Sequence, residues 1–208
     1  MTLIGFDFSI NKPAACVLHK NKYYFISWPY GLKEEIIKTY INAGVEIIGR
    51  KDDKEKGETL SSKMRYEVEN AKYLSNLIAG SLFPYLNIDT FIAFEGLSYA
   101  SSGDVVLQLG GYKYMLMSKL SEVVPLKNMF TYSPITIKSI AGCAKRGMGK
   151  TEMINEFIKS GPLCKFRLTL FEKPELFQSI KAKNWIIHLD DLVDAYWTLM
   201  TLREKESL

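Results

Sequence analysis

The sequence predicts an α/β fold built on one mixed sheet, in which an antiparallel three-strand meander comes first and parallel strands flanked by helices follow. Three short β-type segments, residues 2–9, 14–20 and 22–28, are joined by short turns, which suit antiparallel neighbours. Farther along, apolar runs of strand length alternate with segments whose apolar residues recur at helical spacing. That alternation is typical of crossovers between parallel strands.

The first segment has the pattern of a half-buried strand. Ile4, Phe6 and Phe8 share one face, whereas Gly5 and Asp7 share the other. Asp7 is therefore expected on the face opposite the aromatic side chains.

The later elements follow from apolar runs and from helix start and stop signals. Residues 90–96 are almost continuously apolar, as in a central strand that is buried on both faces, and residues 128–134 predict another short strand. Ser133 followed by Pro134 is a helix-start signal. Helices are expected over residues 31–44, 61–83, 104–123, 134–143, 151–160 and about 190–202.

Length and composition fit one globular domain. The chain has 208 residues, of which 47% are hydrophobic, and its net charge of +4 permits a polyanionic partner without requiring one. Cys16, Cys143 and Cys164 lie far apart, which argues against a disulfide framework and a zinc site and predicts a cytoplasmic setting. The N-terminus lacks the basic flank of a signal peptide, and no apolar run reaches the length of a membrane span.

Acidic residues stand where a carboxylate is costly to bury without a partner. Asp7 lies within the first strand, Glu95 ends the apolar central strand, and Asp190, Asp191 and Asp194 open the last helix. Converging carboxylates repel one another, and magnesium or manganese ions, which prefer oxygen ligands, would relieve that repulsion. Two such ions can hold the attacking and leaving oxygens of a phosphodiester displacement.

Each acid also has an ordinary structural explanation. Asp190 and Asp191 at a helix start commonly act as caps and as partners of the helix dipole. Asp7 taken alone fits an edge strand, and Glu95 taken alone fits a turn. The order of the acids along the chain is what favours a metal site.

Residues 144–151, AKRGMGKT, match the loose phosphate-loop pattern, and residues 186–191, IIHLDD, resemble the apolar run and acid that hold magnesium in such enzymes. An ATPase is therefore one alternative. Against it, a phosphate loop follows a buried strand, whereas residues 134–143 carry a helix-start signal. The chain after Thr151 is also short for a nucleotide-binding domain.

Four stretches, taken in order, resemble the RuvC-like Holliday junction resolvases of the RNase H-like nuclease superfamily. They are IGFDFSINKPAACV, FIAFEGLSYASSGDVVLQLGGYKYML, SPITIKSIAGCAKRGMGKTEMI and HLDDLVDAYWTLM. The pattern is nearer to divergent bacteriophage members than to cellular ones. It implies an RNase H-like sheet in a single domain of residues 1–208, with insertions near residues 50–58 and 170–185.

The resemblance implies a catalytic role for four of the acids. Asp7, Glu95, Asp191 and Asp194 match the family's catalytic positions, and together they would hold two Mg²⁺ ions per active site, for which Mn²⁺ would substitute. Asp190 is left as an extra acid beside them.

The same resemblance implies where DNA binds. Lys138 and Lys150 match basic positions of the family, and Lys145 and Arg146 lie in the connection between them, where they can meet backbone phosphates. The alternative for this connection is a solvated loop. Tyr99 stands near the place where compact members carry an aromatic wedge.

The implied activity is a metal-dependent, structure-selective endodeoxyribonuclease that resolves four-way DNA junctions by paired symmetric nicks and leaves 5′ phosphates. Two symmetric cuts imply a homodimer, for which the helix containing Gly110 and Gly111 is a candidate interface. The implied location is the cytoplasm of a bacterial cell or of a phage-infected host, with no nucleotide cofactor and no membrane partner. The alternatives are another nuclease of this fold, acting on flaps, forks or RNA, and a non-catalytic junction-binding protein.

Overall fold

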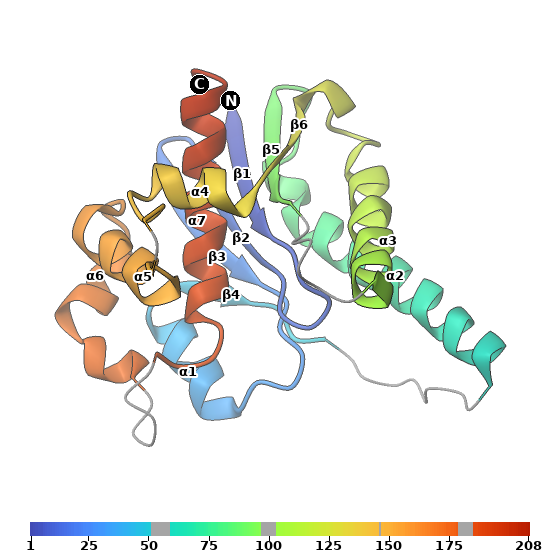
Figure 1. The fold of residues 1–208 in the computed structure, drawn as a ribbon, viewed down its shortest axis with the longest axis horizontal. Helices are drawn as coiled ribbons and strands as arrows, with labels where there is room; N and C mark the ends of the chain where they lie inside the picture. The colour runs from blue at the N-terminus through green and yellow to red at the C-terminus, as the bar shows by residue number, and fades with distance from the viewer. Residues whose placement is uncertain (51–58, 97–102, 146, 179–184) are drawn as a thin grey trace.

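The computed structural model describes residues 1–50, 59–96, 103–145, 147–178 and 185–208, and it contains a six-stranded sheet with helices on both faces (Figure 1). The spatial order of the strands is β4-β3-β2-β1-β5-β6. The strands are β1 (Thr2–Asp7), β2 (Ala14–His19), β3 (Lys22–Ser27), β4 (Val45–Ile47), β5 (Thr90–Glu95) and β6 (Met129–Tyr132).

The predicted strand directions are confirmed. β1, β2 and β3 form an antiparallel meander, and β5 and β6 continue the sheet in parallel on the other side of β1. The pattern did not predict β4, a strand of three residues that pairs in parallel with β3. A strand so short offers too few positions for an alternation to be recognised.

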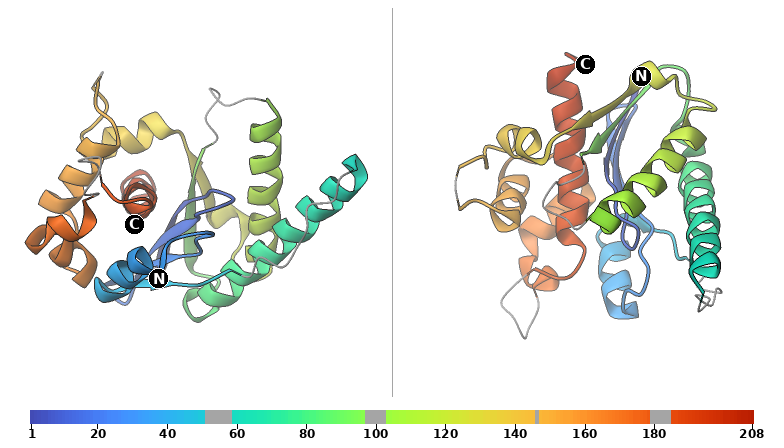
Figure 2. Two further views of the ribbon diagram at one scale, coloured as in Figure 1. Left: turned by 90° about the horizontal axis from the view of Figure 1, so that it is seen from below. Right: turned by 45° about the vertical axis from the view of Figure 1, so that its right-hand side comes forward.

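The longer helices cover the two faces of the sheet. Figure 2 shows α2 and α3 on one side and α7, with the smaller helices, on the other. The helices are α1 (Glu34–Asn42), α2 (Leu60–Leu82), α3 (Gly103–Leu120), α4 (Pro134–Ile140), α5 (Lys150–Ser160), α6 (Lys165–Glu172) and α7 (Leu189–Lys205). Three short 3₁₀ turns are η1 (Phe83–Tyr85), η2 (Leu126–Asn128) and η3 (Pro174–Phe177).

Side chains divide between two cores according to the alternation of the strands. Ile4, Phe6 and Phe94 pack against α2 and α3, whereas Leu3 and Ala93 pack beneath α7. The residues expected on the aromatic face of the first strand therefore lie there, and Asp7 belongs to the α7 face.

The stretch predicted as an insertion near residues 170–185 is partly regular structure. It includes the end of α6 and η3, and the buried rings of Phe166 and Phe177 tie this region to the core. Helix α6 was not predicted from the sequence. Residues 51–58, within the other predicted insertion, lie outside the described residues. Among the described helices, none combines the length and the apolar character that crossing a bilayer requires.

Candidate metal centre

The sheet places two predicted acids side by side. Phe6 of β1 is paired with Phe94 of β5, so the next residues along these parallel strands, Asp7 and Glu95, are neighbours at the strand ends. Both follow an inward-facing aromatic residue, and because side chains alternate along a strand, both carboxylates point to the α7 face.

A glycine lets α7 lie directly on β1. A methyl group built on Gly5 would lie 2.3 Å from both the carbonyl oxygen of Ala195 and the amide nitrogen of Leu199. Such contacts are impossible, so only glycine permits this spacing of helix and strand. Asp194 immediately precedes Ala195, and the close approach of α7 therefore brings Asp194 to the ends of β1 and β5.

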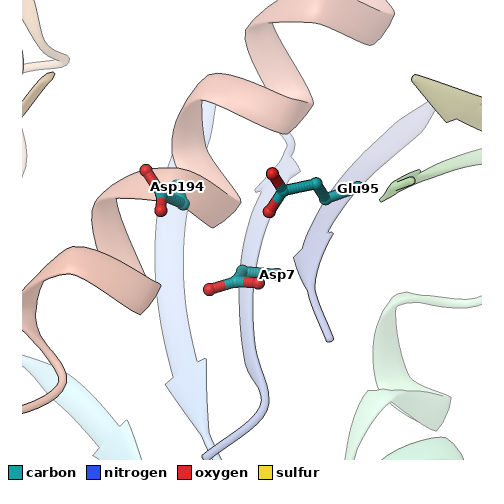
Figure 3. Close-up of side chains that lie close together, drawn as sticks. All are labelled: Asp7, Glu95 and Asp194. Atoms are coloured by element: carbon teal, nitrogen blue, oxygen red, sulfur yellow. The ribbon is translucent and has the colours of Figure 1, made fainter. Parts of the chain in front are cut away.

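Asp7, Glu95 and Asp194 form a carboxylate cluster. Each offers one oxygen, and these three oxygens lie within 4.8 Å of one another. Figure 3 shows the three side chains close together, where α7 passes the ends of the two strands. One atom of the cluster is conspicuous: Asp194 Oδ1 is buried and accepts no hydrogen bond from any described residue. An all-oxygen set with such an atom suits a hard divalent cation.

Electrostatics distinguish the cluster from ordinary surface acids. Burial, followed by the charges of Asp191 and Asp194, raises the pKa of Asp7 well above its usual value. Burial also raises the pKa of Glu95, although nearby lysines oppose the shift, and burial together with the charge of Glu95 raises the pKa of Asp194 to about 8. A bound cation would remove the cost of ionising these groups.

Asp191 lies beside the cluster and is held by a different partner. Its Oδ2 atom accepts a hydrogen bond from His188 Nδ1 at 2.6 Å, and it is not one of the three residues whose oxygens converge. Burial would raise the pKa of Asp191, but the hydrogen bond and charge of His188, with help from Lys150, leave that pKa below the usual value. Its predicted role as a metal ligand stays a prediction.

Asp190 forms an ion pair with Lys150, the first residue of α5. The N-cap residue of α7 is His188, so Asp190 is not the cap, but it lies in the first turn of α7, where the helix dipole favours an acid. Burial lowers the pKa of Lys150, but the hydrogen bond and charge of Asp190 outweigh it and raise the pKa above its usual value. Lys150 is thus firmly cationic beside the acids.

The phosphate-loop interpretation fails on the structure. The segment before Lys150 follows α4, a helix, and residues 186–188 lead into α7 without forming a strand. The expected connection between two helices is what the structure contains. Gly149 is the N-cap residue of α5 and donates its amide hydrogen to Glu152 Oε2 at 2.6 Å.

An open pocket of about 390 Å³ surrounds the cluster, and both Asp191 and the cluster acids line it. Three lysines, Lys113, Lys138 and Lys150, also line this pocket. Lys113 is 5% exposed and donates to the backbone oxygen of Glu95 at 2.9 Å. Burial lowers the pKa of Lys113 to about 8, although the charge of Glu95 opposes the shift.

The other predicted DNA contacts lie outside the pocket or outside the described residues. Lys145 is exposed and does not line the pocket, although its segment leads to Lys150. Tyr99 and Arg146 lie outside the described residues.

Sequence reasoning missed Gly5, Lys113 and His188. Gly5 alternates with the aromatic residues on a buried strand, where a glycine often marks close backbone approach, so a signal was present. Lys113 looks like any polar residue of a helix. His188 stands three residues before Asp191, but nothing in the sequence distinguishes a buried partner of an acid from a loop histidine.

Comparisons with known proteins point to one fold. Neither the family models nor the curated proteins give any match. Among solved structures, RuvC from Thermus thermophilus in complex with a Holliday junction substrate has a TM-score of 0.55 and 12% identity, covering 99% of this chain and 96% of that one. A second Thermus thermophilus RuvC structure has a TM-score of 0.54 and 13% identity, and the match covers 100% of this chain and 97% of that one. The chain has the RuvC fold.

A third neighbour is the yeast mitochondrial Holliday junction resolvase Ydc2, with a TM-score of 0.53, 13% identity and coverage of 99% of this chain and 78% of that one. The RuvC fold confirms the predicted RNase H-like fold class, including the antiparallel meander followed by parallel strands. At such low identity the likeness concerns the fold, while the chemistry depends on the side chains described above.

Proposed function

We propose that the chain is a metal-dependent endonuclease that resolves four-way DNA junctions by paired nicks, acting as a homodimer with two magnesium ions per active site. Manganese would substitute for magnesium. The observation that carries the proposal is the carboxylate cluster of Asp7, Glu95 and Asp194 at the strand ends of a RuvC fold. The solved neighbours are described as acting on Holliday junctions, and that substrate class is transferred here as part of the proposal.

The residues present fit the metal. The cluster offers carboxylate oxygens only, as magnesium and manganese prefer, and Asp194 Oδ1 lacks a partner among the described residues. Asp191, which lines the same pocket, would complete the ligand set. Bound magnesium would supply the charge that activates water and stabilises the leaving oxygen in phosphodiester hydrolysis.

Lysines of the pocket suit a DNA backbone. Lys138 and Lys150 line it beside the carboxylates, and Lys145 lies exposed in the connection between α4 and α5. In our proposal these side chains contact phosphates and set the position of the strand, whereas the acids hold the metal. Arg146 and Tyr99 remain proposed DNA contacts from the sequence alone.

A homodimer would present two active sites to the two strands that must be cut. A groove of about 700 Å³ between α2 and α3 supports this part of the proposal. Met64, Val68 and Leu107 line it and are 60%, 58% and 75% exposed, which is costly for apolar side chains in water. Gly111 also lines the groove and faces open space, because a methyl group built there would meet no atom within 4 Å. Light scattering of the purified chain would test the dimer.

The decisive experiment is incubation with a mobile four-way DNA junction in magnesium, with cuts mapped on all four strands. Linear duplex, flap, fork and RNA substrates run in parallel, and calcium or a chelator replaces magnesium in control reactions. We expect symmetric paired nicks on the junction that require magnesium or manganese. Preferential cutting of flaps, forks or RNA would instead favour another nuclease of this fold.

Asp7→Asn is the matched active-site variant. It keeps the shape of the side chain and removes one coordinating charge, so cleavage should fall by orders of magnitude while junction binding persists. If this variant cuts as fast as the wild type at saturating magnesium, the assignment of the cluster is refuted. Junction binding without cleavage by the wild-type chain, under all metal conditions, would favour a non-catalytic binding protein.

A further inference from the structure

A buried hydrogen-bond chain leads to Asp191 from behind the pocket. His188 Nδ1 contacts Asp191 Oδ2 at 2.6 Å, and His188 Nε2 contacts the hydroxyl of Ser27 at the end of β3. Ser27 is 0% exposed and His188 is 1% exposed. Asp191, at the other end of the chain, lines the pocket. The three side chains therefore connect the sheet to one edge of the candidate metal centre.

His188 is held in an unusual backbone conformation. Its φ of +82° lies in the left-handed region, which is unfavourable for an ordinary L-residue. Tyr40 of α1 supports the turn: its hydroxyl donates to the carbonyl oxygen of Ile187 at 3.0 Å, and its ring meets the His188 ring edge-on at 6.0 Å. Glycine or asparagine would suit this backbone better, so the imidazole ring is what the position supplies.

The connection of serine, histidine and aspartate has the order of a hydrolytic triad, but it does not act as one. Neither Ser27 nor His188 lines the pocket, and both are buried, so no substrate reaches the hydroxyl. The hydrogen-bond chain ends instead at Asp191, which does line the pocket. Its effect on chemistry must therefore pass through the carboxylate of Asp191.

The contact with Asp191 requires a proton on Nδ1 of His188. His188 Nδ1 and Asp191 Oδ2 are 2.6 Å apart, and a carboxylate oxygen accepts, so Nδ1 is the donor. Ser27 on the other side fixes the rotation of the ring. With Oδ2 occupied in this way, the carboxylate of Asp191 is held in one orientation relative to the cluster.

We propose that His188 is a positioning residue for the nuclease reaction, which orients Asp191 through the hydrogen bond from Nδ1 to Oδ2. This inference rests on the proposed function for its catalytic consequence, whereas the hydrogen-bond chain itself can be tested without activity. Outer partners that orient a metal-binding carboxylate typically contribute 10–100-fold to metal affinity or activity.

Two isosteric substitutions separate the two ends of the ring. In His188→Asn the amide nitrogen lies about where Nδ1 lies, so the donor to Asp191 is kept, and asparagine tolerates the left-handed backbone. In His188→Gln the amide nitrogen lies about where Nε2 lies, so the contact with Ser27 is kept and the donor to Asp191 is lost. The two variants therefore differ in the contact that the proposal requires.

We expect His188→Gln to lower the single-turnover cleavage rate at saturating protein by about 10–100-fold, with the junction dissociation constant unchanged. His188→Asn should recover most of that loss. The control is His19→Gln, which changes the chain's other histidine. His19 lies at the end of β2 that is far from Asp7 and the pocket. Equal cleavage by wild type and His188→Gln, or equal losses in both His188 variants, would overturn the proposal.

Nuclear magnetic resonance of the ring nitrogens supplies a readout that needs neither metal nor DNA. With only two histidines in the chain, the signals are readily assigned by the His19 variant. We expect a protonated Nδ1 in His188 of the wild type, with a changed signal in Asp191→Asn. An unprotonated Nδ1 would overturn the proposal even if the enzyme is active. A protonated Nδ1 in a wild-type chain that cleaves no substrate would instead refute the proposed function.

Discussion

Gly5→Ala should impair the candidate metal centre although Gly5 carries no functional group. The added methyl group would lie 2.3 Å from backbone atoms of Ala195 and Leu199, whereas carbon and oxygen in contact need about 3.3 Å. Both clashing atoms belong to the backbone of α7, so no flexible side chain can move aside. Helix α7 must therefore move away from β1 by about 1 Å, and Asp194 must move with it.

The displacement has two consequences of different kinds. Overpacking of a core contact typically costs about 1–3 kcal/mol of unfolding free energy, which for a chain of this length lowers the melting temperature by roughly 2–12 °C. A misplacement of about 1 Å can also cost about 10²-fold in rate. We therefore expect Gly5→Ala to fold, to melt earlier and to cleave a junction about 10²-fold more slowly than wild type.

The assays are thermal unfolding and single-turnover cleavage on the same preparations. Gly80→Ala is the matched control, because Gly80 lies on α2 and a methyl group there meets no atom within 4 Å. That control should be as active as wild type and more stable by about 0.5–1 kcal/mol. If Gly5→Ala matches wild type in both assays, the close contact between β1 and α7 does not set the position of Asp194.

Two further predictions concern charge. Folding raises the pKa of Asp194 to about 8 from an ordinary 3.8, so between these pH values the metal-free folded chain holds a proton that the unfolded chain has lost. The contribution of Asp194 to stability should therefore fall from about pH 4 to 8, by at most about 1.4 kcal/mol per pH unit, and the melting temperature of Asp194→Asn should fall less steeply than that of wild type. Melting in a chelator across that range checks it, and a wild-type melting temperature that rises with pH would contradict it. Lys150→Ala should remove one phosphate contact and so reduce the slope of log affinity against log salt concentration by about 0.9. The slope is measured by the binding of junction DNA in calcium. The control variant, Lys159→Ala at the far end of α5, should leave the slope unchanged. Equal slopes in wild type and Lys150→Ala would remove Lys150 from the DNA-binding surface.

A local pattern was sufficient to place one acid of the cluster on its face of the sheet. The alternation of β1 assigns Asp7 to the face opposite Phe6, and the parallel pairing of β1 with β5 brings Glu95 to the same edge. The first placement needs only the period of a strand, which is a property of a short segment, whereas the second needs the pairing of two strands far apart in the sequence, which the structure supplies.

The remaining contacts join residues far apart in the sequence, and no local pattern predicted them. Lys150 meets Asp190 across forty residues of sequence, and His188 reaches Ser27 across a still longer separation. Charge pattern alone suggested a helix cap for Asp190, because at a helix start that is the commonest role of an acid. Only the packing of α5 beside α7 places Lys150 next to Asp190, so that the acid forms an ion pair.

The partners of the acids also explain why the pocket has two kinds of carboxylate. Asp190 is paired with Lys150 and Asp191 with His188, so the protein itself stabilises the charges of both. Within the described residues, the carboxylate cluster forms no salt bridge, and the pKa of each of its members is raised. Ionising these three side chains together is costly, and a bound cation would remove that cost. Because Gly5 sets the approach of α7, the same close contact that makes the cluster costly to ionise also gives it the spacing to hold a metal.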